Sequence, residues 1–278
     1  MVTGRGAVIT GFKLLNKHKY FLILPVMWEL LKVLSFYFGF GFHIPWPAQW
    51  GFYLNFSLPR LWPSLDQILP RPLLGPDYSV VIMELANNKA GWVLVFFAGY
   101  ILIDAIVRSM FLLLIKAKIG GLKVEVGKFI REVREVLGQF ILLRVITVLG
   151  AIILALFERD TNWPPGVTLM LILLGNLALA FVDLAIVYQK VNVTRALAVN
   201  MYILQAFPRP VFELFIWGMI INGLVSVPIN WAIGSLVGLI GSVLIYNYVA
   251  ISLALAMLYI YTGYANLVSE DMLSEVKS

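Results

Sequence analysis

Six stretches of mostly apolar residues, each close to the length of a membrane-spanning helix, constrain this chain more than any other feature. An α-helix rises 1.5 Å per residue and needs about 20 apolar residues to cross the hydrocarbon core of a bilayer. The residues are 61% hydrophobic and 13% charged, against about 45–50% and about 25% in soluble domains. We therefore expect an all-α, polytopic integral membrane protein with a single membrane domain over residues 1–278. The predicted transmembrane helices span residues 20–42, 91–115, 138–157, 167–188, 211–229 and 235–261.

The distribution of Lys and Arg predicts the orientation of these spans. Loops on one side hold most of the bases, and loops on the other side hold only Arg60, Arg71, Lys89 and Arg159. Because basic loops stay in the cytoplasm, the sequence predicts a cell-membrane protein with both termini cytoplasmic. We interpret the net charge of +6 as a basic rim facing anionic lipids, and expect no nucleic-acid partner. Tryptophans at the outer ends of spans agree with this orientation: Trp46, Trp50, Trp62, Trp92, Trp163 and Trp231.

The chain also resembles itself at three places where a basic stretch runs directly into a span. These are "GFKLLNKHKYFLILPVMWELLKVL", "GKFIREVREVLGQFILLRVITVLG" and "TRALAVNMYILQAFPRPVFELFIWG". Residues 127–137 of the second copy alternate apolar and charged positions with helical spacing, which predicts an amphipathic helix lying on the inner interface. One interpretation is three helical-hairpin repeats. The other is that any inner loop joining two spans has this pattern.

The segment 43–89 differs from the rest because it combines many prolines with many aromatic residues. Its prolines rule out a long helix, but "WPAQWGFYLNFSLPRLW" is too aromatic for a solvated linker. We expect an outer loop that lies on the headgroup layer or caps the bundle.

Seven charged residues lie inside the predicted spans. All fall in the cytoplasmic half, roughly 5–18 Å from the inner end of a span. A lone charge at the centre of a membrane helix costs about 2.5–3.5 kcal/mol on insertion scales, so we expect these charges to pair in a shared polar layer facing the bundle interior. The seven are Glu29, Lys32, Asp104, Arg108, Arg144, Asp183 and Glu213.

Spacing predicts some of the pairs. Glu29 and Lys32 are three residues apart and Asp104 and Arg108 four apart, so each pair shares a helix face. Arg144 has no such neighbour and can meet Asp183 or Glu213 only across helices.

Two interpretations of the polar layer remain open. It is either structural, with ion pairs that fix how the helices pack, or a binding site for a substrate or ion. Four acids face three bases, which leaves one acid over. Asp104 lies deepest and is the best candidate for a protonatable or cation-binding group.

The stretch "GSLVGLIGS" spaces small residues along one face of the last predicted span. Such spacing lets two helices approach closely. We expect Gly234, Gly238 and Gly241 to pack tightly inside the bundle or against a second copy in a homo-oligomer or protein complex.

The sequence shows little sign of catalysis. It has no cysteine, and its two histidines, His18 and His43, lie at opposite ends of the first predicted span. No Gly-rich phosphate loop is present. We expect no enzymatic activity, no metal and no cofactor.

The layout of the chain resembles a class of prokaryotic six-span membrane domains. The resemblance rests on "FKLLNKHKYFLILPVMWELL", the Pro-rich outer segment, "VEVGKFIREVREVLGQFILLRV" and "NVTRALAVNMYILQ". The class includes the membrane domain that precedes the soluble part of some glycerophosphodiester phosphodiesterases. The resemblance implies a six-span fold, and the sequence departs from those enzymes in having no phosphodiesterase domain.

These observations lead to two functional expectations. The first is transport or permeation of a small solute or lipid, by the chain alone or as the membrane subunit of a complex. The alternative is a non-catalytic scaffold that binds a protein partner or anionic lipid through its cytoplasmic interfacial helices.

Overall fold

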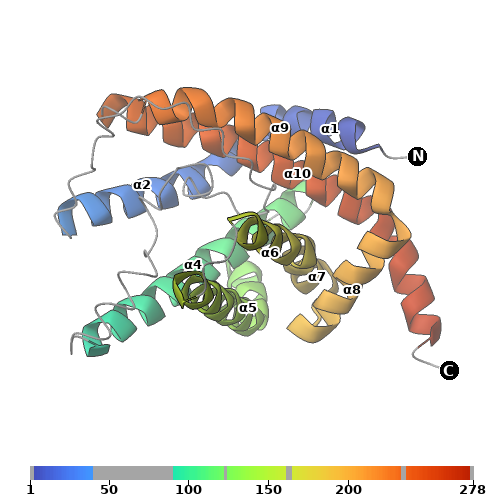
Figure 1. Ribbon diagram of the computed structural model, residues 1–278. Helices are drawn as coiled ribbons and strands as arrows, with labels where there is room; N and C mark the ends of the chain where they lie inside the picture. The colour runs from blue at the N-terminus through green and yellow to red at the C-terminus, as the bar shows by residue number, and fades with distance from the viewer. Residues whose placement is uncertain (1–2, 40–89, 122–123, 161–164, 233–235, 276–278) are drawn as a thin grey trace. The chain divides into compact units, whose positions relative to one another are not determined.

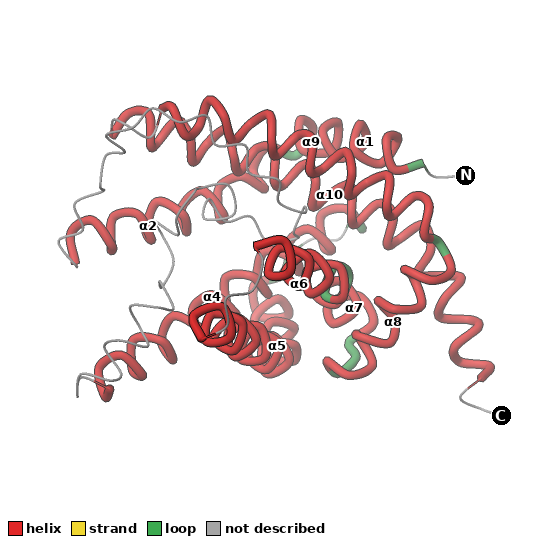
Figure 2. The backbone as a smooth tube through the Cα atoms, viewed as in Figure 1, coloured by secondary structure: helices red, strands yellow, loops and turns green. Residues whose placement is uncertain are grey.

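Helices make up most of the part of the chain that the computed structural model describes, namely residues 3–39, 90–121, 124–160, 165–232 and 236–275. The all-α prediction is confirmed, because no strand occurs within these ranges (Figure 2). The predicted outer segment 43–89 lies outside the described residues. The helices are α1 (Gly4–Lys17), η1 (Lys19–Leu22), α2 (Ile23–Gly39), α4 (Ala90–Ile119), α5 (Val126–Asp160), α6 (Pro165–Ala178), α7 (Val182–Gln189), α8 (Val193–Ala206), α9 (Pro208–Ala232) and α10 (Leu236–Glu275).

Several of these helices are long and apolar enough to span a membrane. Within the described ranges, three helices meet that requirement, at Ala98–Ile119, Pro208–Ile229 and Val237–Gly263. A fourth span is present if the bent pair Leu173–Gln189 and Val193–Ala206 counts as one. The six predicted spans are therefore not confirmed.

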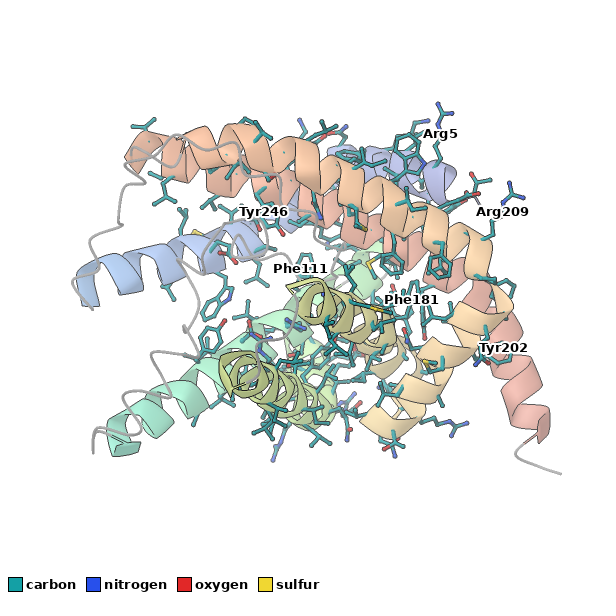
Figure 3. All side chains as sticks on the ribbon, in the orientation of Figure 1. Arg5, Phe111, Phe181, Tyr202, Arg209 and Tyr246 are labelled. Atoms are coloured by element: carbon teal, nitrogen blue, oxygen red, sulfur yellow. The ribbon has the colours of Figure 1, made fainter. Side chains whose placement is uncertain are left out.

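The chain divides into two compact units. The first comprises Met1–Leu74 and Ala198–Ser278, and the second comprises Gly75–Leu197. In the first unit α1 lies along α9 and α10, and α2 packs on α10 (Figure 1). One apolar core of this unit forms where α9 and α10 meet α2. Its buried residues are Ile229, Leu239, Val243, Tyr246 and Ala250, with Val26, Leu30 and Val225 packed against them. Tyr246 is labelled in Figure 3.

Two glycines allow α1 to approach its neighbours closely. A side chain at Gly11 would collide with the carbonyl oxygen of Ser252 and lie 2.9 Å from the amide nitrogen of Ala256 on α10. A side chain at Gly4 would collide with the backbone of Leu214 on α9. The amino-terminal basic stretch therefore forms a packed helix of its own before the predicted first span begins.

The second unit is built around α4, α5 and α7, each of which contacts the other two. The helix α5 is continuous over 35 residues, or about 52 Å at 1.5 Å per residue. Residues 127–137 and the predicted span 138–157 thus belong to one continuous helix. No turn separates the predicted interfacial part from the predicted membrane part. Exposed apolar residues follow one another along one side of this helix, as a lipid-facing surface requires: Leu142, Ile146, Leu149 and Ile153.

The predicted fourth span, 167–188, is interrupted. α6 ends at Ala178 and α7 begins at Val182, and the intervening turn is held by tight backbone hydrogen bonds. The amide of Ala180 donates to the carbonyl of Leu177 at 3.2 Å, and the amide of Val182 donates to Leu179 at 3.3 Å. The chain then bends by 119° between α7 and α8.

The three similar stretches of the sequence do not fold alike. The first and third each form a 14-residue helix, α1 and α8, followed by a break and another helix. The middle stretch forms the continuous α5.

One of the glycines predicted to pack tightly in the last span has no such contact inside the chain, and packing against a second copy stays a prediction. Gly234 lies outside the described residues, and a side chain at Gly241 would meet no atom within 4 Å. The close approach on α10 occurs further along the helix, at Ser252 and Ala256, because the partner there is Gly11.

A candidate site of four buried charges

The second unit gathers four of the seven predicted charges into one cluster. Tyr100, Asp104 and Arg108 follow one another at four-residue spacing and so lie on one face of α4. That face packs against α5, which carries Arg144, and against α7, which carries Asp183. Residues from three helices therefore meet, and we call Asp104, Arg108, Arg144 and Asp183 the charge cluster.

Each charge in the cluster has a partner of opposite sign. Arg108 Nη1 donates a hydrogen bond to Asp183 Oδ2 at 3.1 Å, and Arg108 Nη2 lies 3.7 Å from Asp104 Oδ2. Arg144 Nε lies 3.1 Å from the same Asp104 oxygen. Arg108 thus bridges the two carboxylates, and Asp104 receives both guanidinium groups.

Arg144 also contacts a tyrosine of α4. Its Nη2 donates to Tyr100 Oη at 3.4 Å, and its guanidinium carbon lies 5.8 Å from the centre of the Tyr100 ring. The tyrosine extends the cluster by one neutral hydroxyl group. Tyr100 was not among the predicted site residues, although its position four residues before Asp104 places it on the same helix face.

The cluster is buried and has no net charge. The Asp104 and Asp183 side chains are 3% and 9% exposed, and both arginine side chains are about one-fifth exposed. Two carboxylates and two guanidinium groups sum to zero, which reduces the cost of placing them in an apolar environment.

In the Arg108–Asp183 pair, two polar atoms are buried without a hydrogen-bond partner among the described residues. One is Asp183 Oδ1, an acceptor, and the other is Arg108 Nε, a donor. Both belong to the ion pair between α4 and α7. Unsatisfied buried polar atoms are uncommon in native proteins, and they often mark places where a ligand, ion or water binds.

The broken helix places Asp183 at a helix start. Asp183 is the second residue of α7, and α7 follows the interruption after α6. A carboxylate in the first turn is favoured by the helix dipole. The segment Val182–Val187 is buried throughout, so this start lies inside the unit.

The remaining predicted site residues lie in the first unit or outside the described side chains. Glu213 contacts the first turn of α1, because its Oε2 accepts a hydrogen bond from the Gly4 amide at 3.0 Å. Its Oε1 accepts a hydrogen bond from Arg209 Nε at 3.0 Å. Glu29 is fully buried on α2. Lys32 also lies on α2, but its side chain is outside the described part.

The partner of Arg144 differs from both predicted partners. The sequence offered Asp183 or Glu213, whereas the structure pairs Arg144 with Asp104. Asp104 was the predicted spare acid, and it has the most cationic neighbours of the cluster. The reason is that α5 lies beside α4, which the linear sequence cannot specify.

Polar side chains of α4 and α5 also hold the bend between α7 and α8. Lys116 Nζ donates to the carbonyl oxygen of Val187 at 2.7 Å, which satisfies a backbone group at the end of α7. Gln139 Oε1 accepts a hydrogen bond from the Val193 amide at 3.0 Å, at the start of α8. Lys190, in the left-handed region with φ 54°, reaches Glu135 Oε2 at 2.7 Å.

The contact with Lys190 shifts the titration of Glu135. The hydrogen bond from Lys190 and its positive charge lower the pKa of Glu135 below the ordinary value of 4.5. The pair is solvent-exposed, so its contribution to stability is small.

Across the described ranges, no three His, Asp or Glu side chains gather as metal ligands would. Comparison of the sequence and fold with protein-family models, curated proteins and solved structures found no match.

Proposed function

We propose that this chain is an integral protein of the cell membrane, with both termini cytoplasmic, that transports a small solute or lipid, alone or as the membrane subunit of a complex. The charge cluster carries this proposal. Four ionisable side chains from three apolar helices meet in a buried place beside an interrupted helix.

The energetics of the cluster favour a functional role over a purely structural one. Replacing a buried ion pair with apolar residues of similar volume is often neutral or stabilising. Apolar side chains alone would therefore hold α4, α5 and α7 together. Ionisable groups within membrane helices commonly mark substrate or ion pathways.

The interrupted helix supports the same function. Discontinuous helices near the middle of the membrane form the substrate and ion sites of many secondary transporters. The interruption at Leu179–Phe181 comes directly before Asp183, whose carboxylate pairs with Arg108. A backbone break and a charged pair therefore meet at one point.

A reconstitution experiment tests the proposal. The purified protein is placed in liposomes and its uptake of labelled inorganic phosphate, lactate, choline, alanine and glycerol is measured, together with movement of fluorescent lipid between leaflets. We expect flux of at least one probe in the wild type and loss of that flux in Arg108→Gln and Arg144→Gln. Arg209→Gln is the matched control, because Arg209 is 89% exposed and lies in the first unit.

The outcomes separate clearly. Flux that disappears in the two cluster variants and persists in Arg209→Gln supports transport through the cluster. Absence of flux for every probe, or unchanged flux in Arg108→Gln, contradicts it.

A scaffold function is the second candidate, and one observation favours it. At the start of α5, Val126 and Ile130 are 72% and 61% exposed, beside the exposed bases Lys128, Arg131 and Arg134. Exposed apolar residues next to bases suit the surface of an anionic membrane. Purification in mild detergent separates the two functions, since a scaffold brings a stoichiometric protein or anionic lipid that is lost in the triple variant Lys128→Gln, Arg131→Gln, Arg134→Gln.

A further inference from the structure

The charge cluster has one unused acceptor and one unused donor on the same ion pair. Asp183 Oδ1 lacks a donor and Arg108 Nε lacks an acceptor among the described residues. A proton on Asp183 Oδ1 would convert this acceptor into an O–H donor, and an oxyanion would accept hydrogen bonds from that O–H and from Arg108 Nε. The two are chemically linked, because a protonated Asp183 no longer neutralises Arg108.

Charge balance sets the stoichiometry. With both carboxylates ionised the cluster is neutral, and with a proton on Asp183 it has one excess positive charge. One bound monoanion restores neutrality. Binding an anion without a proton would leave a net negative charge in a buried place, which is unfavourable.

The surroundings of Asp183 make it the acid that takes the proton. Asp104 has two cationic neighbours, Arg108 and Arg144, whereas Asp183 pairs with Arg108 alone. The other charged groups that α4 and α5 direct toward α7 and the bend after it are Lys116, which bonds the carbonyl of Val187, and Glu135, which bonds Lys190. On α7 itself the remaining titratable side chain is Tyr188.

We propose that the cluster binds one small oxyanion, a carboxylate or a phosphate ester, together with one proton. The proton bonds to Asp183 Oδ1, the Arg108–Asp183 ion pair opens, and the guanidinium of Arg108 binds the anion through two hydrogen bonds. No covalent bond other than the O–H bond is made or broken. The inference rests on the proposed transport function and assigns it an electroneutral proton-linked anion as cargo.

Guanidinium groups suit this ligand. Their planar donors match the two oxygens of a carboxylate or phosphate, and such paired hydrogen bonds are stronger than neutral ones. Arg144 stays with Asp104 and Tyr100 while Arg108 is engaged. The site therefore keeps one fixed ion pair and uses one exchangeable pair.

The test measures binding to the purified wild-type protein by calorimetry. The probes are acetate and dimethyl phosphate, which do not titrate between pH 6 and 8, and tetramethylammonium. Measurement in two buffers of different ionisation enthalpy gives the number of protons taken up per anion. We expect one proton per anion, and an affinity that weakens roughly tenfold for each unit of increasing pH.

Two variants make the test specific. Asp183→Asn resembles the protonated acid, so it binds the anion with no proton uptake and with an affinity independent of pH. Arg108→Gln does not bind. If Asp183→Asn fails to fold, the number of protons that the wild type takes up per anion and the pH dependence of its affinity test the same linkage.

A second arm identifies the source of the anion. The protein is placed in nanodiscs of phosphatidylcholine with and without phosphatidylglycerol, whose phosphodiester matches dimethyl phosphate. Binding of the soluble probes unaffected by phosphatidylglycerol assigns a free solute, and competition by phosphatidylglycerol assigns a lipid headgroup. Binding of tetramethylammonium, anion binding without proton uptake, or no anion binding at any pH overturns the inference.

These results remain distinct from those of the transport assay. The binding equilibrium needs no sealed vesicle, so absence of flux with intact proton-linked binding contradicts transport alone. Flux of a neutral or cationic probe without anion binding contradicts the inference alone.

Discussion

Arg108 is the residue on which the charge cluster depends, because its guanidinium contacts both carboxylates. It lies 3.1 Å from one Asp183 oxygen and 3.7 Å from one Asp104 oxygen. Removing one partner from a buried ion pair leaves an uncompensated charge, at a cost of about 3–5 kcal/mol. Truncating either aspartate leaves one excess cation, whereas truncating Arg108 leaves one excess negative charge and removes the ion-pair partner of Asp183.

We therefore predict that Arg108→Gln lowers the free energy of unfolding by about 3–5 kcal/mol. Arg209→Gln changes it little, because that pair is exposed. Denaturant titration in detergent micelles measures both changes. Equal and small effects of the two variants would show that the cluster is not a buried ion-pair network.

The sequence predicts one ion pair of the charge cluster, but it does not predict the ion-pair partner of Arg144. Helix periodicity alone places Asp104 and Arg108 on one face, and the structure has them in contact. The partner of Arg144 depends on which helices are neighbours, and no local pattern encodes that. The sequence favoured Asp104 as the protonatable acid, whereas the contacts in the structure favour Asp183.

At the scale of single elements, the packing of α1 on α10 shows how a short polar helix is held. Gly11 permits the backbones to meet, and Tyr248 Oη donates a hydrogen bond to Asn16 Oδ1 at 2.9 Å. Glu213 accepts a hydrogen bond from the first turn of α1. The sequence gives no local sign of this packing, because the partners are more than 200 residues away.

We predict that Gly11→Ala destabilises the first unit by about 1–3 kcal/mol through overpacking. Gly138→Ala is the control, since a side chain there meets no atom within 4 Å and alanine is about 1 kcal/mol better than glycine in a helix. Thermal unfolding in detergent measures both. A higher melting temperature for Gly11→Ala would contradict the close approach of α1 and α10.

The bend between α7 and α8 depends on contacts from α4 and α5. The sequence "YQKVNV" contains neither glycine nor proline, so breaker residues do not reveal the 119° turn. The interruption at Leu179–Phe181 likewise has no breaker residue. Tertiary contacts, such as the hydrogen bond from Lys116 to the carbonyl of Val187, stabilise the bend in place of local helix-breaking residues.

We predict that Glu135→Gln speeds amide hydrogen exchange at Lys190–Val193 at pH 7, because the contact with Lys190 is weakened. The melting temperature changes little, as expected of an exposed pair. Since Lys190 lowers the pKa of Glu135, the contact is fully present above pH 4.5 and is lost only as the pH falls through that lowered pKa.

Hydrogen–deuterium exchange with mass spectrometry at pH 7 and pH 3 checks this prediction. The wild type and the variant should differ at pH 7, and the difference should be smaller at pH 3, because protonation of Glu135 weakens the contact. Glu125→Gln, at another exposed glutamate just before α5, serves as control. A difference that persists unchanged at pH 3 would contradict the assignment to this pair.

At the scale of the whole molecule, the amino-acid composition predicts the all-α fold class correctly. It does not predict the number of membrane-spanning helices. An all-helical chain with membrane-length apolar helices follows from 61% hydrophobic residues in long uninterrupted runs. The number of spans does not follow, because an apolar run does not reveal where a helix breaks. The predicted fourth span is two helices, and a third helix follows it after a sharp bend.

The absence of cysteine from the sequence makes the proposed topology easy to test. We predict that a membrane-impermeant maleimide labels Arg60→Cys in intact cells. Arg131→Cys and Asn192→Cys should be labelled only after the membrane is permeabilised, because positive-inside orientation places them in the cytoplasm. Labelling of Arg131→Cys in intact cells, or failure to reach Arg60→Cys from outside, would contradict both termini being cytoplasmic.

The double variant Arg108→Gln, Asp183→Asn tests the central claim most directly, because it removes one ion pair and leaves the cluster neutral. Its proteoliposome flux is compared with that of the wild type, for whichever probe the wild type carries. A structural role predicts normal flux in a protein that folds, since neutral amides replace the pair. Our account predicts a folded protein with a melting temperature near that of the wild type and no flux, and flux at the wild-type rate would contradict it.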